Sequence, residues 1–235
     1  MTNFIPVNVE SLGRPMKIVS INVGMPRETV WKDTVVRTGI FKEPVDGPIV
    51  INTLNLAGDG QADLKVHSGE AKAVYAYPHE HYNYWRQELP DLSFSFGMFG
   101  ENLTTEGLLE NSLCIGDRLR AGSAVLMVTQ PRMPCYKLAL RFGRDDMIKR
   151  FLASGRSGFY LSVIESGEVR AGASIEVLSR DRHRVIASPA DISTLFLNET
   201  LEPDLLERAT NVSALPQNWK VQLRLRAKSG VFISA

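Results

Sequence analysis

The residues with the clearest chemical potential surround Cys135. The thiol lies in residues 130–137, QPRMPCYK, where two prolines restrict the backbone as the chain leaves a strand-like segment. Arg132 and Lys137 bracket the thiol, and nearby positive charge favours the thiolate, which is both the nucleophile and the ligand for soft metals. The alternative is the buried, inert side chain typical of a lone cysteine. We interpret Cys114, which has no basic residue within three positions, in that second way.

Two further segments concentrate polar residues. Residues 58–72, GDGQADLKVHSGEAK, could offer backbone N–H groups together with His67 and Lys72 to an anion. The segment matches neither the dinucleotide-binding nor the P-loop glycine pattern, so a polar surface loop is the alternative. Residues 99–108, FGENLTTEGL, could bind a polar ligand or simply build turns through their Asn and Thr side chains.

These segments need strands and helices to hold them in place. Short runs with alternating or β-branched apolar residues predict strands at Lys17–Val23, Thr34–Ile40, Pro48–Leu54, Ala71–Tyr77, Ser123–Thr129, Gly158–Ile164 and Ser174–Ser179. Apolar residues at helical spacing predict one helix from Pro78 to the stop at Pro90 and another from Asp145 to Gly155. Three short helices follow, beginning near Ser188, Glu202 and Pro216.

This pattern predicts an α+β chain in two parts. Many short strands separated by turn residues favour a barrel or sandwich, and three successive helices favour a small bundle. We therefore expect a β-rich, barrel-like domain over residues 1–182 and a three-helix domain over residues 183–235, with the boundary in the polar run RDRHR.

The overall composition narrows the class of protein. With 235 residues, 44% hydrophobic and 23% charged, the chain can bury a core, and its net charge of +1 gives no overall field for nucleic acid or an anionic membrane. No apolar run approaches the roughly 20 residues of a membrane span, and the N-terminus lacks a signal-peptide pattern. We expect a cytoplasmic protein with reduced thiols and no membrane contact.

The last predicted helix carries an uneven charge. Lys220, Arg224, Arg226 and Lys228 lie beyond the last acidic residue. A solvated helix face is the plainer interpretation, and a contact with an acidic partner or with nucleic acid is the alternative.

The segments GDGQADLKVHSGEAKAVYAYPHEHYNYW, FGENLTTEGL with a following IGD, and QPRMPCYKL, in this order, resemble the MOSC family (molybdenum-cofactor sulfurase C-terminal domain). The resemblance runs from about residue 50 to residue 180 and is strongest to the YiiM type, whose C-terminal "3-alpha" domain the tail also resembles. One departure is Ser68, where the family usually has glycine after the histidine.

The resemblance implies a β-rich, barrel-like fold and a set of site residues. The family cysteine that matches Cys135 either binds molybdenum or carries sulfur as a persulfide. The cations and N–H groups that would hold the phosphate of the pterin cofactor are Arg132, Lys137, Lys72, His67 and the loop at Gly69. The residues that would bind the pterin edges or shape the pocket are Glu101, Asn102 and Thr104.

Two functions follow from the resemblance. The first is a molybdenum-cofactor (molybdopterin) enzyme that reduces N-hydroxylated compounds such as 6-hydroxylaminopurine to amines, with electrons from a separate redox protein and a proton from Tyr136, Glu101 or His67. The second is a non-redox persulfide carrier or cofactor-binding protein that uses Cys135. A nucleic-acid module built on the basic last helix is a weaker third, and a homodimer is compatible with the sequence.

Overall fold

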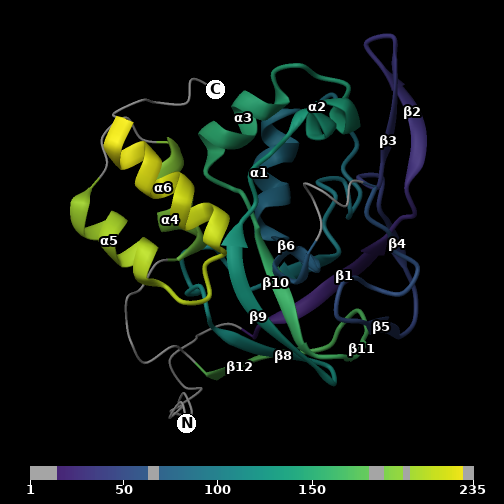
Figure 1. The fold of residues 1–235 in the computed structure, drawn as a ribbon. Helices are drawn as coiled ribbons and strands as arrows, with labels where there is room; N and C mark the ends of the chain where they lie inside the picture. Colours follow the sequence, from purple (N-terminus) through teal and green to yellow (C-terminus); the bar gives the residue numbers. More distant parts are fainter. Residues whose placement is uncertain (1–14, 63–68, 180–187, 198–201, 230–235) are drawn as a thin grey trace.

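The computed structural model describes residues 15–62, 69–179, 188–197 and 202–229 as an α+β fold (Figure 1). Its main sheet has eight strands in the order β12-β8-β9-β10-β6-β7-β1-β4, and two small two-stranded sheets, β11-β5 and β2-β3, lie beside it. The strands are β1 (Lys17–Val23), β2 (Arg27–Trp31), β3 (Thr34–Thr38), β4 (Glu43–Val45), β5 (Ile49–Ile51), β6 (Val74–Pro78), β7 (Leu103–Glu106), β8 (Arg118–Ala121), β9 (Ala124–Pro131), β10 (Phe159–Glu165), β11 (Gly167–Val169) and β12 (Ile175–Ser179). The helices are α1 (Glu80–Glu88), α2 (Tyr136–Phe142), α3 (Met147–Ser154), α4 (Pro189–Leu197), α5 (Pro203–Asn211) and α6 (Gln217–Ser229), with a short 3₁₀ turn at Glu70–Lys72.

The α+β class is confirmed, but the sheet is not a closed barrel. Within the described residues its strand ladder runs from β12 to β4, and those two end strands do not pair. Backbone hydrogen bonds nevertheless bring the start of β1 against the residues that lead into β12, since Ile18 N donates to Ala173 O and Ile175 N to Met16 O. The sheet therefore curves strongly without forming a continuous ring of strands.

The structure has a strand within each predicted segment, but the first and last residues of most strands differ from the predicted ones. Strand β1 matches its predicted bounds, whereas residues 71–73 enter the 3₁₀ turn and β6 begins only at Val74. Strand β9 lies inside the sheet with seven of its eight residues buried, so both of its faces are covered. The short strands β4, β7, β8 and β11 have too few residues to show a period of two, which is why the sequence did not predict them.

Helix α2 was also missed, and it matters most for the site. It begins directly after Cys135, spans only seven residues, and ends at Gly143, whose φ of 64° lies in the left-handed region. Its apolar residues, Leu138 and Phe142 among them, are buried against α3 and the aromatic cluster around Trp85. Such a short helix is stable only through this tertiary packing, so its sequence alone carried little signal.

Helices α4, α5 and α6 lie together beside β9 (Figure 1). Their apolar residues belong to the same core cluster as the sheet: Ile192 and Leu195 from α4, Leu205 from α5, and Trp219 and Leu223 from α6. The predicted boundary between residues 182 and 183 lies outside the described residues, so the two-domain division stays a prediction. In the described part of the chain, no helix combines the length and the apolar character that a membrane crossing requires.

Candidate functional site

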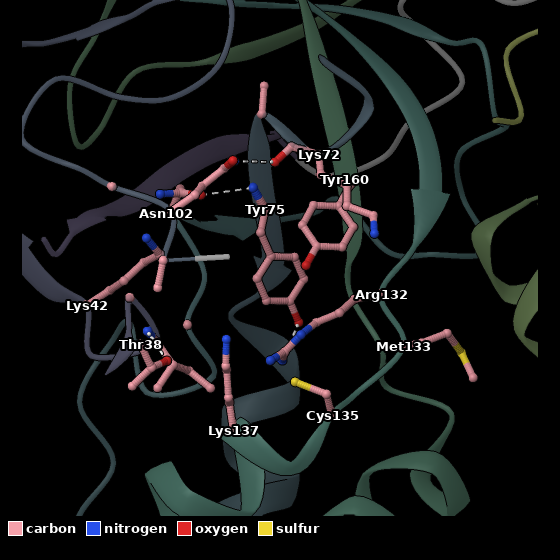
Figure 2. A pocket seen from close by; sticks show the side chains of 17 residues that line it. Thr38, Lys42, Lys72, Tyr75, Asn102, Arg132, Met133, Cys135, Lys137 and Tyr160 are labelled. Carbon is pink, nitrogen blue, oxygen red and sulfur yellow. Dashed lines mark hydrogen bonds between the residues drawn. The ribbon is translucent and has the colours of Figure 1, made fainter. Parts of the chain in front are cut away.

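A pocket lies where β6, β9 and β10 meet the start of α2, and Cys135 faces it (Figure 2). Segments 38–42 and 60–62 close the opposite side. The pocket therefore brings together side chains from parts of the chain that are more than a hundred residues apart, from Thr38 to Tyr160. Its lining residues that carry polar or ionisable side chains are Thr38, Lys42, Gln61, Lys72, Tyr75, Asn102, Arg132, Cys135, Lys137 and Tyr160.

Cys135 is half-buried. Pro131 and Pro134, which precede it, restrict its backbone as the sequence predicted. Strand β9 ends at Pro131, and α2 begins at Tyr136, so the thiol lies in the short connection between two fixed elements. Lys137, in the first turn of α2, points into the same space as the sulfur (Figure 2). Met133 points away from the other pocket side chains (Figure 2).

Arg132 forms the floor of the pocket beside Cys135. Its side chain is almost fully buried, its Cζ lies 4.8 Å from the ring centroid of Tyr75, and its Nη1 donates to Tyr75 Oη at 3.4 Å. Tyr75 Oη in turn donates to Ser157 O at 2.8 Å. A buried guanidinium stays charged, so this arrangement holds a permanent cation close to the thiol.

Two lysines add positive charge from other elements. Lys72 lines the pocket together with Cys135; burial lowers the pKa of Lys72, and the negative charge of a Cys135 thiolate acts in the opposite direction. Burial also lowers the pKa of Lys42, and the Asp59 carboxylate opposes it. With Arg132 and Lys137, four basic side chains line one pocket of a protein whose net charge is only +1. The pocket is therefore suited to an anionic ligand.

The wall around Lys42 is a buried polar network. Lys42 Nζ bonds to Asp59 Oδ1, which also accepts from Gly24 N at 3.0 Å. Asp59 Oδ2 accepts from Asn102 Nδ2 at 2.8 Å, and Asn102 Oδ1 accepts from Tyr75 N at 3.1 Å. Asn102 thus links the wall to strand β6, and its amide is already committed to structural bonds.

Tyr160 completes the pocket on the β10 side. Its ring centroid lies 5.2 Å from that of Tyr75, and its backbone pairs with Gln130 in β9. Burial raises the pKa of Tyr160, and Arg132 acts in the opposite direction. The phenol can therefore act as a hydrogen-bond donor to a ligand in the pocket.

Two predicted ligand-binding residues lie behind the pocket instead of lining it. Glu101 and Thr104 are fully buried, and Thr104 Oγ1 donates to Glu101 Oε1 at 2.9 Å. Glu101 also accepts from Tyr82 Oη and from the backbone N–H groups of residues 97 and 99. Burial raises the pKa of Glu101, and these donors oppose that shift. These bonds fix the turn before β7, which fits the second of the two predicted roles, shaping the pocket; a contact with a pterin edge stays a prediction.

The remaining predicted residues divide between the pocket and its surroundings. Lys72, Asn102, Arg132, Cys135 and Lys137 all line the pocket. Gly69 does not line it, although its carbonyl accepts from Lys72 N at 2.9 Å, and His67 lies outside the described residues. The sequence missed Lys42, Tyr75 and Tyr160, because an isolated lysine and tyrosines within strand patterns carry no local signal of function.

The composition of the pocket limits how it could hold a metal ion. Among the described residues, no group of three or more His, Cys, Asp or Glu side chains is arranged to ligate one. Among the described side chains that line the pocket, the thiol of Cys135 is the soft metal ligand. The pocket therefore combines one soft ligand, the sulfur of Cys135, with the cationic side chains of Lys42, Lys72, Arg132 and Lys137.

Comparison with known proteins identifies relatives along most of the chain. The MOSC domain family model matches residues 63–176. The chain is 38% identical over 203 residues to the uncharacterized protein YflK of Bacillus subtilis, with 86% of this chain and 90% of YflK covered. It is 37% identical over 195 residues to protein YiiM of Escherichia coli, with 82% and 86% covered.

Solved structures and a longer relative extend this result. The crystal structure of YiiM from Geobacillus stearothermophilus matches with a TM-score of 0.73 and 33% identity, over 90% of this chain and 99% of that one. A protein of Gibberella moniliformis named as a reductase is 36% identical over 149 residues, which cover 62% of this chain but only 26% of the reductase.

Proposed function

Because the chain belongs to the MOSC domain family, we propose that it is a molybdenum-cofactor-binding oxidoreductase with Cys135 as the protein's ligand to molybdenum. The observation that carries the proposal is one thiol facing a pocket lined by Lys42, Lys72, Arg132 and Lys137. The partial match to a protein named as a reductase supports the reaction class.

The residues present fit the proposed group. A phosphate on the pterin would meet cationic donors, of which Arg132 offers the planar fork that suits phosphate oxygens. The pterin ring would pack against aromatic side chains such as Tyr75 and Tyr160, which contact each other in the pocket. A single thiolate matches the donor set of a metal whose remaining ligands come from the cofactor.

The proposed substrate is an N-hydroxylated compound such as 6-hydroxylaminopurine. The bound cofactor would supply the two-electron reduction, and the overall change is R–NH–OH + 2 e⁻ + 2 H⁺ → R–NH₂ + H₂O. The chain must bind the substrate beside Cys135 and deliver a proton to the departing oxygen. Glu101 is too deeply buried for that role, while Tyr160 lines the pocket and retains its proton. We therefore propose Tyr160 as the proton donor in the pocket.

A carrier function for Cys135 is the second candidate. In this case the thiol holds one extra sulfur atom as a persulfide and no electrons pass to a substrate. The half-buried position of the thiol beside cations would also stabilise a persulfide anion. The two candidates share one residue and differ in what is bound to it.

One experiment separates the two candidates. The protein is purified from a host that makes the cofactor, and its molybdenum, pterin and cyanide-labile sulfur are quantified. We expect about one molybdenum per chain, since one thiol is available to bind it, and reduction of 6-hydroxylaminopurine with an artificial electron donor. Cyanide-labile sulfur without molybdenum, and without reduction of the substrate, would contradict the reductase and support the carrier.

The electrons would come from a separate protein in the cytoplasm, and the outer face of α6 is the proposed contact. Lys220, Arg224 and Lys228 follow one another at intervals of four residues, which places them on one face. Val221 and Leu225 lie beside them and are 43% and 60% exposed. This mixture of cations and exposed apolar groups complements an acidic redox protein.

Arg226, by contrast, is buried and donates to Phe196 O, so it belongs to the fold and not to this face. Replacing Lys220, Arg224 and Lys228 by Gln is expected to lower the turnover rate with the protein electron donor about tenfold at low salt. Turnover with the artificial donor should stay unchanged, because no substituted residue lines the pocket. Equal turnover by the variant and the wild type with the protein donor would exclude this face.

A further inference from the structure

Helix α6 is connected to the pocket through one buried amide. Trp219 Nε1 donates to Gln130 Oε1, and Gln130 Nε2 donates to the carbonyl oxygen of Ala71 at 3.3 Å. Trp219 and Gln130 are both buried, so neither bond competes freely with water. The two bonds form a continuous path from the C-terminal helices to the residue that precedes Lys72.

Gln130 occupies a position from which it can affect three pocket walls. It lies two residues before Arg132 at the end of β9, and its backbone pairs with that of Tyr160 in β10. Its side chain holds Ala71, whose carbonyl also accepts from Thr129 Oγ1 at 2.7 Å. Gln130 itself does not line the pocket, so any effect it has on a ligand acts through these neighbours.

The Trp219 side chain, at the α6 end of these two hydrogen bonds, is held in place by core packing. Its ring packs edge-on against Phe196 of α4, with the centroids 4.6 Å apart, and both side chains belong to the core cluster shared with the sheet. The orientation of its N–H is therefore set by the packing of α4 and α6. A side-chain amide that rotates about its last bond needs such a fixed partner to hold one orientation.

We propose that Trp219 and Gln130 are positioning residues that hold Lys72 in the wall of the pocket that Cys135 faces. The C-terminal helices would then set the electrostatic field of the pocket in addition to covering β9. The proposal concerns the chain's own residues and does not depend on which cofactor or sulfur species occupies Cys135. If this proposal fails, the proposed reductase function still stands. If the reductase function fails, this proposal still stands.

The test measures the field at Cys135 directly. Iodoacetate, an anion, and iodoacetamide, a neutral reagent, both alkylate the thiolate, so the ratio of their rates cancels the fraction of thiol that is ionised. The ratio is read from the peptide that carries Cys135, in protein free of cofactor and at low salt, where charge effects are least screened. Lys72→Met calibrates the measurement and is expected to lower the ratio about threefold, as loss of one charge several ångströms away predicts.

Trp219→Phe keeps the buried ring and removes only the N–H donor. It is expected to lower the ratio about twofold, less than Lys72→Met does, because a freed Gln130 amide leaves the Ala71 carbonyl held by Thr129 Oγ1 alone. Trp85→Phe is the matched control, since Trp85 Nε1 also makes a buried hydrogen bond, to Tyr77 Oη at 2.7 Å, in a different core cluster. The control should lose similar stability and leave the ratio of alkylation rates unchanged. If Trp219→Phe also left this ratio unchanged, its effect would be on stability alone.

Gln130→Met removes both bonds at once and provides the same test if Trp219→Phe does not fold. It is expected to lower the ratio by at least about twofold. Unchanged ratios in Trp219→Phe and Gln130→Met, beside a lowered ratio in Lys72→Met, would overturn the proposal. A ratio that Lys72→Met leaves unchanged would overturn it too, since no charge would then remain for the path to position.

Discussion

Cys135→Ala is expected to lose both its molybdenum and its reductase activity. Cys135 is the proposed ligand to the metal, and among the described residues of the pocket it is the soft ligand, whereas the surrounding cations suit the anionic part of the cofactor. We expect turnover to fall by more than about 100-fold, because changing even an outer partner of a metal ligand costs about 10- to 100-fold. Molybdenum per chain and the rate of 6-hydroxylaminopurine reduction are measured on proteins purified side by side.

Cys114→Ala is the matched control for this substitution. Cys114 is half-buried too, and its backbone N–H donates to Asp117 Oδ2, but the thiol does not line the pocket. Its removal should leave molybdenum content and turnover near the wild-type values. A Cys135→Ala protein that keeps its molybdenum and its activity would contradict the proposed ligand, and with it the proposed mechanism.

Glu101→Gln is expected to destabilise the fold by about 2 kcal/mol. The carboxylate of Glu101 is fully buried and accepts from Tyr82 Oη, Gly97 N, Phe99 N and Thr104 Oγ1. A glutamine can accept through only one of its two terminal atoms, so its NH₂ group would face a donor and leave that donor unsatisfied. The free energy of unfolding in urea is the measurement, with the midpoint read at constant m-value.

Glu70→Gln gives the comparison, because Glu70 is exposed in the 3₁₀ turn and its substitution should change stability by less than about 0.5 kcal/mol. A Glu101→Gln variant as stable as the wild type, or more stable, would show that the buried carboxyl carries a proton and donates it. Such a result would fit the raised pKa that burial produces and would reassign the hydrogen bonds of this turn.

The chemically distinctive part of the site could be predicted from local sequence. Arg132, Cys135 and Lys137 lie within six residues of one another, so their proximity to each other follows from chain connectivity. The flanking prolines restrict the backbone enough that the thiol had to lie at the exit of a strand. The resemblance to the MOSC family rested on ordered segments of this kind, and the comparisons confirm it.

The other half of the pocket depends on contacts that the sequence does not show. Lys42 and Asn102 come together because Asp59 bonds to both, and no pattern in the chain pairs these three positions. The position of Glu101 behind the pocket has the same origin. A polar residue in a turn-rich segment can face a ligand or the interior, and only packing decides which.

The sequence by itself determined the fold class and singled out Cys135 as the candidate thiol of this protein. Periodicity acts over a few residues, so it could identify β1, α1 and α3, together with the helical character of the tail. Only the tertiary structure decided that the sheet stays open, that Cys135 is followed by helix α2, and that Trp219 bonds to Gln130. These features arise from contacts between segments far apart in the chain, whose free energy depends on three-dimensional packing and leaves no periodic trace in the sequence.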